Sequence, residues 1–139
     1  MTRYVLDSDI LSLFQRGDPI VTAQVARCAP DEVAMTIVSV EEQLSGWYTL
    51  LRRARMAKEL VPVYERMSEA VRFFAKLPVL TFTETAAGIY EQLRTQKRRT
   101  GRMDLRIAAI ALAHHAAIVT RNANDFRGIE GLEVLDWSR

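Results

Sequence analysis

Cysteine, glycine and proline are all scarce in this chain. Its one cysteine, Cys28, excludes an internal disulfide, so the sequence shows no sign of an oxidising compartment. Six glycines and four prolines among 139 residues form no low-complexity tract and no linker. We therefore expect one domain that covers residues 1–139.

The chain also lacks a long hydrophobic run. Its most apolar stretch, residues 107–120, contains His114 and His115 and is too short to span a bilayer. No basic segment followed by an apolar one marks a signal peptide at the N-terminus. These absences predict a cytoplasmic protein with no membrane partner.

Neither sign of charge is in clear excess. The chain has 19 Lys and Arg against 17 Asp and Glu, and a formal charge of +2 does not by itself predict a nucleic-acid partner. Hydrophobic residues make up 49% of the chain, which is enough to bury a core. The distribution of the charges is therefore more informative than their balance.

What the sequence does contain is a series of short apolar runs separated by helical patterns. The first run, residues 4–6, is followed directly by Asp7, and such a run predicts a buried strand. Strands that alternate with helices indicate crossover connections and a parallel sheet. The sequence thus predicts an α/β fold with a mainly parallel sheet of four or five strands, at residues 4–6, 33–36, 79–82, 116–120 and 132–135.

Local signals mark several helix ends. Gly17 is typical of the end of a helix, and Asp18 followed by Pro19 is typical of a helix start. Ser39 and Glu42 have the spacing of a capping box, which predicts a helix that begins at Ser39. We also expect a helix that restarts at Pro62, an apolar helix face from Val63 to Leu77, and a helix over 103–115 with His115 buried and His114 at the surface.

Four acidic residues fall where a parallel sheet presents its ligands, outside the carboxyl ends of its strands. They are Asp7, Glu42, Asp104 and Asp125. Clustered carboxylates repel one another, so they normally hold a cation. Oxygen ligands without Cys or paired His select Mg²⁺ or Mn²⁺ over Zn²⁺. The pattern predicts a magnesium site at this edge.

Each acid also has a simpler interpretation. Asp is a favoured N-cap, which accounts for Asp7 or Asp9. An acid in a first helical turn interacts favourably with the helix dipole, which accounts for Glu42 and Asp104. Asp125 orders its own loop in this interpretation. Only the convergence of all four acids at one edge separates the two interpretations.

The ordered set of motifs resembles the PIN domain and, more closely, the VapC-type toxins of bacterial toxin–antitoxin pairs. The motifs are Asp7 after an apolar strand, Ser39-x-x-Glu42 with Gly46, Asp104-x-x-Ile107-Ala108-Ala109, and Thr120-Arg121-Asn122-x-x-Asp125-Phe126. The resemblance covers nearly the whole chain. It implies a three-layer α/β/α sandwich, RNA cleavage that depends on Mg²⁺ with Mn²⁺ as a substitute, a homodimer, and a small cognate antitoxin.

The resemblance also assigns roles to residues. Metal binding and catalysis fall to Asp7, Glu42, Asp104 and Asp125. Orientation of these acids through hydrogen bonds falls to Ser8, Thr120 and Asn122. The chain departs from the family pattern at three positions: Ser8 stands where Thr is frequent, Asp9 where Asn is frequent, and Gln43 where an apolar residue is usual.

Basic residues cluster in two places. Arg94, Arg98 and Arg102 follow one another at intervals of four, so they share a helix face if one helix continues that far. Beside an acidic metal site, this face is expected to bind the phosphates of RNA. A second cluster contains Arg52, Arg53, Arg55 and Lys58. The simpler interpretation of both clusters is a solvated surface.

Three other functions fit parts of the pattern. A phosphatase of the haloacid-dehalogenase type would use Asp7 as nucleophile and Asp9 as acid, but no Lys lies in a matching later motif. A phospho-acceptor receiver domain has adjacent acids after its first strand, and here Ser8 intervenes. A PIN-like domain without catalysis would only bind a partner.

Overall fold

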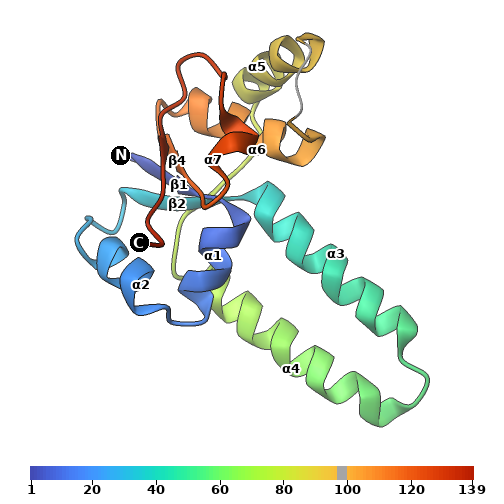
Figure 1. Ribbon diagram of the computed structural model, residues 1–139. Coiled ribbons are helices and arrows are strands. Elements are labelled where there is room, and N and C mark those ends of the chain that lie inside the picture. The colour runs from blue at the N-terminus through green and yellow to red at the C-terminus, as the bar shows by residue number, and fades with distance from the viewer. Residues whose placement is uncertain (97–99) are drawn as a thin grey trace.

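Five short strands form one sheet in which every neighbouring pair is parallel (Figure 1). A computed structural model describes residues 1–96 and 100–139 of the chain. The strand order is β3-β2-β1-β4-β5, so β1 lies at the centre and the last strand at an edge. The strands are β1 (Tyr4–Leu6), β2 (Val33–Thr36), β3 (Val79–Leu80), β4 (Ala117–Val119) and β5 (Val134–Leu135). The α/β class and the parallel sheet are confirmed.

Helices connect the strands, and most begin where the sequence signals place them. The side chain of Asp18 accepts a hydrogen bond from the backbone N–H of Val21 (3.0 Å), and Pro19 is the first residue of its helix. Gly17 has a φ of +78°, the left-handed conformation that ends a helix. The described helices are α1 (Ser8–Gln15), α2 (Pro19–Ala26), α3 (Ile37–Arg53), α4 (Ala57–Phe74), α5 (Glu84–Thr95), α6 (Arg102–Ala113) and α7 (Ala123–Phe126).

The two faces of the sheet are buried under different helices. Successive residues of a strand point to opposite faces. Val5 and Ile118 pack with residues of α5, α6 and α7, whereas Leu6 and Val119 pack with residues of α1 and α2 and with the end of α4. The molecule is therefore a three-layer α/β/α sandwich.

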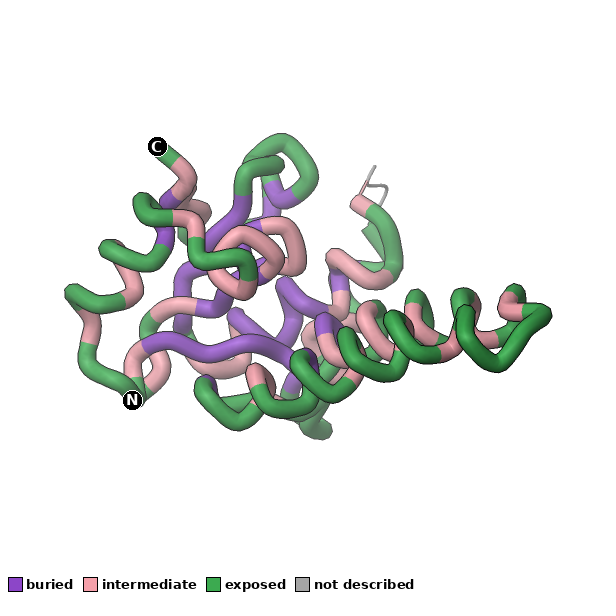
Figure 2. Tube along the Cα trace, turned by 90° about the horizontal axis from the view of Figure 1, so that it is seen from below, coloured by how far each residue is buried: buried purple, intermediate pink, exposed green. Residues whose placement is uncertain are grey.

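The helices α3 and α4 leave this sandwich together as a hairpin (Figure 1). Figure 2 shows that the hairpin is exposed or half-buried over most of its length, whereas the central strands β1, β2 and β4 are almost entirely buried. The apolar face expected from Val63 to Leu77 is only partly covered, since Ala70 is buried but Val71 is 60% exposed. The hairpin thus presents apolar surface that another protein is able to cover.

Some predicted boundaries are wrong. Helix α3 begins at Ile37, because Thr36 caps it by accepting a hydrogen bond from the backbone N–H of Ser39 (3.3 Å). The capping box of Ser39 and Glu42 therefore does not form, and Glu42 lies beyond the first turn. Pro62 lies inside α4 and does not restart it, so the helix continues on both sides of the N–H that proline lacks. Strands β3, β4 and β5 are each two residues shorter than expected.

Among the described residues, no helix has both the length and the apolar character that crossing a membrane requires.

Candidate active site at the carboxyl edge of the sheet

The centre of the site is Asp7, which follows β1 directly. Leu6 pairs with Val119 in the parallel register, so the residues that follow them, Asp7 and Thr120, lie side by side at the carboxyl edge. The hydroxyl of Thr120 donates a hydrogen bond to Oδ2 of Asp7 (2.9 Å), and the backbone N–H of Ser8 donates one to Oδ1 (2.8 Å). Thr120 thus orients the first acid, in the way the sequence predicts.

The carboxyl group of Asp7 is poorly suited to carry a charge in this position. Its residue is only 6% exposed. The pKa of Asp7 is raised to about 7, mainly by burial and to a smaller extent by the nearby charges of Asp9 and Asp104. The hydrogen bonds from Ser8 and Thr120 act in the opposite direction, but they do not compensate for the burial. Asp7 therefore caps α1 and also requires a positive charge to ionise easily.

Ser8 connects the first acid to the second. Its hydroxyl donates a hydrogen bond to Oε1 of Glu42 (2.9 Å) and lies 3.0 Å from the hydroxyl of Ser39. Glu42 is exposed on α3, so this contact holds an otherwise free carboxylate against α1. Ser39 is fully buried at the start of α3. Ser8 was predicted for this role, whereas Ser39 was predicted only as a helix cap, because the spacing of Ser39 and Glu42 is that of a capping box.

Asp104 and Asp125 complete the set of acids. Asp104 lies in the first turn of α6 and is half-buried, whereas Asp125 lies on the short helix α7 and is exposed. The pKa of Asp104 is raised, mainly by burial and then by the charges of Asp125, Glu42 and Asp9. The structure therefore brings Asp7, Glu42 and Asp125 within electrostatic range of Asp104.

A fifth acid, Asp9, holds the loop that follows β4. Its Oδ2 accepts hydrogen bonds from the backbone N–H of Arg121 and from Nδ2 of Asn122, both at 3.1 Å. The guanidinium Nε of Arg121 lies 3.9 Å from the same oxygen. Asn122 was expected to orient the four acids directly, but its side chain bonds to Asp9 instead. The sequence marks Asp9 only by its departure from the family that the chain resembles, in which Asn is frequent at this position.

The charges of the four acids are suited to a divalent cation. Within residues 1–96 and 100–139, no Lys, Arg or His forms an ion pair with any of them. In the same residues, no three Asp, Glu, His or Cys side chains gather closely enough to enclose a metal ion directly. Mg²⁺ usually keeps several waters and binds one or two carboxylates, so these oxygen ligands fit it without a closed cage.

The predicted basic face is not continuous. Helix α5 ends at Thr95 and α6 begins at Arg102, so Arg94 and Arg102 lie on different helices. Arg94 is exposed and pairs with Glu91 (2.9 Å), and Arg98 lies outside the described residues. The expectation of one shared helix face is wrong, because the helix on which it depended ends too early. The second basic cluster lies at the exposed tip of the α3–α4 hairpin.

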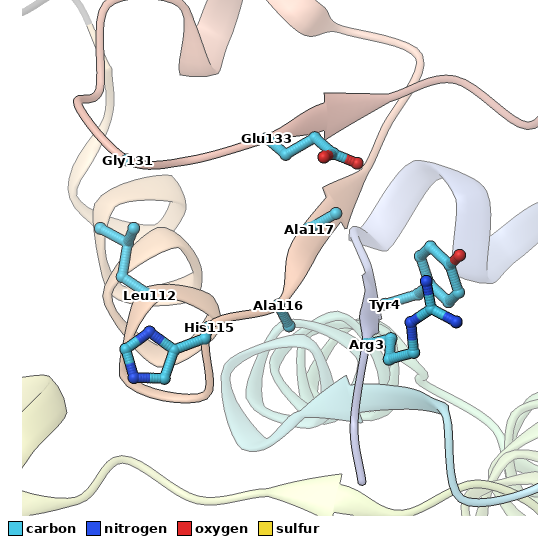
Figure 3. A pocket seen from close by; sticks show the side chains of 8 residues that line it. All are labelled: Arg3, Tyr4, Leu112, His115, Ala116, Ala117, Gly131 and Glu133. Carbon is cyan, nitrogen blue, oxygen red and sulfur yellow. The ribbon is translucent and has the colours of Figure 1, made fainter.

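A cavity of about 340 Å³ lies at the opposite, amino edge of the sheet (Figure 3). His115 lines it, but the side chains of His115 and Glu133 do not point toward one another. Arg3 also lines the cavity, and its guanidinium pairs with Glu32 (3.1 Å). His115 is exposed with a φ of +53°, because α6 ends before it, so the expectation that His115 is buried is wrong. This cavity gathers no catalytic group.

Comparisons with known proteins are consistent with a nuclease. No family model matches the chain. The chain is 25% identical over 138 residues to Ribonuclease VapC1 of Haemophilus influenzae, and the match covers 98% of each protein. It is 25% identical over 142 residues to the tRNA(fMet)-specific endonuclease VapC of Shigella flexneri, with 99% and 100% covered. Among solved structures, the chain is similar to VapBC2 from Rickettsia felis bound to a DNA fragment from its promoter. The match covers 98% of this chain and 99% of the Rickettsia chain, with a TM-score of 0.80 and 22% sequence identity.

Proposed function

We propose that the chain is a VapC-type PIN-domain toxin that cleaves RNA phosphodiester bonds with the help of Mg²⁺. The observation that carries the proposal is the group of four acids at one sheet edge, two of them with a raised pKa and none of them paired with a cation in the described part of the chain. The mutual repulsion of unpaired acids costs stability, because like charges repel. The group is useful if a cation and a phosphate complete it.

Different residues of the site would have different roles in the reaction. Asp7, Glu42 and Asp104 would hold the metal ion, directly or through water, and Asp125 would close the site from α7. When bound, Mg²⁺ neutralises the phosphate oxygens and lowers the pKa of water for in-line attack on phosphorus. Thr120 and Ser8 fix the oxygens of Asp7 and Glu42 through hydrogen bonds of 2.9 Å each. Asp9 fixes the loop that leads to Asp125. Together these contacts preorganise the acids before RNA arrives.

The hypothesis of a haloacid-dehalogenase-type phosphatase finds less support. That reaction needs Asp9 as a free acid beside the nucleophile Asp7. Both carboxylate oxygens of Asp9 accept hydrogen bonds, from Ile10 (2.6 Å) and from the loop after β4. Asp9 therefore serves the structure of the loop, and we assign Asp7 to the metal.

The experiment is RNA cleavage by the purified protein in Mg²⁺, in Mn²⁺ and in EDTA. We expect cleavage in either metal and none in EDTA, while Ca²⁺ supports little turnover because its looser coordination positions water poorly. A phosphatase assay with a small phosphate monoester serves as the control and should show no activity. Undiminished RNA cleavage in EDTA would disprove the metal dependence.

We further propose that the protein is a cytoplasmic homodimer that binds a small antitoxin. The support is the exposed apolar surface of the α3–α4 hairpin, where Val61 and Tyr64 are each 53% exposed. An amphipathic helix of a partner is a common way to cover such a surface. Light scattering tests this on the protein alone and on the protein co-expressed with any small protein that is encoded directly upstream of it. A monomer at high micromolar concentration that retains no partner would contradict it.

A further inference from the structure

A groove of about 300 Å³ begins at the candidate active site and runs between α1 and α3. Glu42 lines it, so the groove reaches the proposed metal site. Polar side chains face each other along this seam because of helical spacing: Ser8 and Gln15 lie two turns apart on α1, and Ser39 and Gln43 lie one turn apart on α3. Ser8 contacts Ser39, and Gln15 contacts Gln43. The groove therefore has polar side chains along one seam, and beside them lie Trp47 and Leu50 of the hairpin helix α3.

The amides of Gln15 and Gln43 form a reciprocal pair. Nε2 of Gln15 donates to Oε1 of Gln43 (3.1 Å), and Nε2 of Gln43 donates to Oε1 of Gln15 (2.9 Å). Each amide keeps one N–H and one carbonyl lone pair, because an amide has two donors and two acceptor sites. The pair thus offers adjacent donors and acceptors to a ligand in the groove, while each amide holds the other in place.

The groove also contains an aromatic ring and free space next to a glycine. Trp47 lines it, and the indole Nε1 of Trp47 is buried without a hydrogen-bond partner among the described residues. No hydrogen bond therefore fixes the orientation of this ring, and a buried unpaired donor is unfavourable. Gly46 lies beside Trp47 in the lining, and a Cβ added at Gly46 would meet no atom within 4 Å. The space above Gly46 is free for a flat group.

We propose that this groove binds a nucleobase of the RNA next to the bond that is cleaved. The inference rests on the proposed ribonuclease function. Proteins recognise single-stranded RNA by stacking splayed bases on aromatic rings and by hydrogen bonds to base edges. Glutamine amides read base edges because their donor and acceptor are adjacent. This groove provides such contacts beside the proposed catalytic carboxylate: it has a pair of amides, an indole ring, and free space next to a glycine. An apolar side chain of a partner protein would leave the free amide edges unsatisfied.

Two variants block the groove in different ways. Gly46→Leu fills the free space with a side chain that the helix tolerates well, since leucine is a better helix former than glycine. Gly88→Leu is its matched control, because Gly88 is also an exposed helical glycine with no atom within 4 Å of an added Cβ, but on α5. Gln43→Leu removes one amide edge and leaves the space open.

The first measurement is cleavage of a pool of short RNAs with all four bases at each position. We expect the wild type to prefer certain bases at one position beside the cut. Gln43→Leu should reduce that preference by about threefold to tenfold, the range of one hydrogen bond between neutral groups. Gly46→Leu should raise KM and lower kcat/KM, and Gly88→Leu should match the wild type. An unchanged base preference in Gln43→Leu, with cleavage retained, overturns the inference and leaves the ribonuclease function intact.

The second measurement does not need catalysis. Trp137→Phe leaves Trp47 as the one tryptophan, because the chain has two. With Asp7→Asn added to prevent cleavage, short RNA should quench the fluorescence of Trp47. Gly46→Leu in this background should abolish the quenching, and Gly88→Leu should preserve it. Equal quenching in both glycine variants overturns the inference. A second outcome also overturns it. In that outcome Gly46→Leu prevents the binding of a protein partner, while RNA cleavage and the quenching by RNA stay unchanged.

Discussion

The two edges of the parallel sheet carry the same kinds of acidic residue in opposite electrostatic states. At the amino edge, Asp31 pairs with the N-terminal amine and Glu32 pairs with Arg3, and the pKa of each acid is lowered. At the carboxyl edge, the pKa values of Asp7 and Asp104 are raised. The chain therefore neutralises its acids at one edge and leaves them unneutralised at the other.

Under the proposed function, the difference indicates which edge of the sheet would bind the metal ion. Acids that pair with cations of their own chain contribute to folding and have little remaining affinity for a metal ion. Acids that are buried near one another cost stability until a cation from solution arrives. We therefore expect the acids of the carboxyl edge to lower the stability of the metal-free protein and to bind a metal ion, and we expect neither effect at the amino edge. Substitutions at the two edges should have effects of opposite sign on the stability of the metal-free protein.

The largest expected effect is on cleavage. Asp104→Asn removes one charge from the carboxyl edge with almost no change in shape. We expect kcat to fall on the order of a thousandfold, because metal catalysis supplies several kcal/mol to the transition state. Glu32→Gln makes the same chemical change at the amino edge and should leave kcat unchanged. Equal activity of both variants would remove Asp104 from the site.

An intermediate effect is expected on the pH dependence of stability. The pKa of Asp7 is about 7 in the folded protein, against an ordinary value of 3.8. Below about pH 4 the carboxyl is protonated in both states, so it costs nothing. Between about pH 4 and pH 7 the unfolded chain gives up this proton while the folded state keeps it, so the wild type loses stability relative to Asp7→Asn as the pH rises, and the loss is complete above about pH 7. The difference reaches on the order of 4 kcal/mol at most, since one pKa unit corresponds to about 1.4 kcal/mol.

Urea unfolding of metal-free wild type and Asp7→Asn across this pH range measures that effect. Millimolar Mg²⁺ should stabilise the wild type near neutral pH, because the ion binds only the folded state, and should barely affect Asp7→Asn. If the acid only caps α1, the variant should instead be less stable at every pH and Mg²⁺ should change nothing. Parallel pH profiles for the two proteins would contradict the raised pKa of Asp7.

The smallest effect is expected at the amino edge. Glu32→Gln keeps an acceptor for the backbone N–H of Ala29 but loses the ion pair with Arg3. Because the pKa of Glu32 is lowered in the folded protein, its contribution is present at neutral pH and is lost in acid. The melting temperature should fall slightly at pH 7, since exposed ion pairs contribute little. It should match the wild type in acid and should not respond to Mg²⁺. A Mg²⁺-dependent shift would show that both edges bind metal.

The sequence by itself determined the sheet and the edge that carries the chemistry. The apolar run at Tyr4–Leu6 and the alternation of strands and helices require parallel crossovers, and parallel strands place Asp7 and Thr120 at one edge. Local signals such as Asp18-Pro19 also fixed a helix start, because they act within one turn of the chain. These features depend on neighbours in the sequence or on a rule of topology.

Tertiary structure alone decided how the site is assembled. Ser39 has the sequence of a helix cap, yet Thr36 takes that role while Ser39 is buried against Ser8. The bond between Asp9 and Asn122 and the reciprocal amides of Gln15 and Gln43 join segments that are far apart in the chain. No local pattern encodes such contacts, because they form only when the sheet brings α1, α3 and the loop after β4 to the same edge.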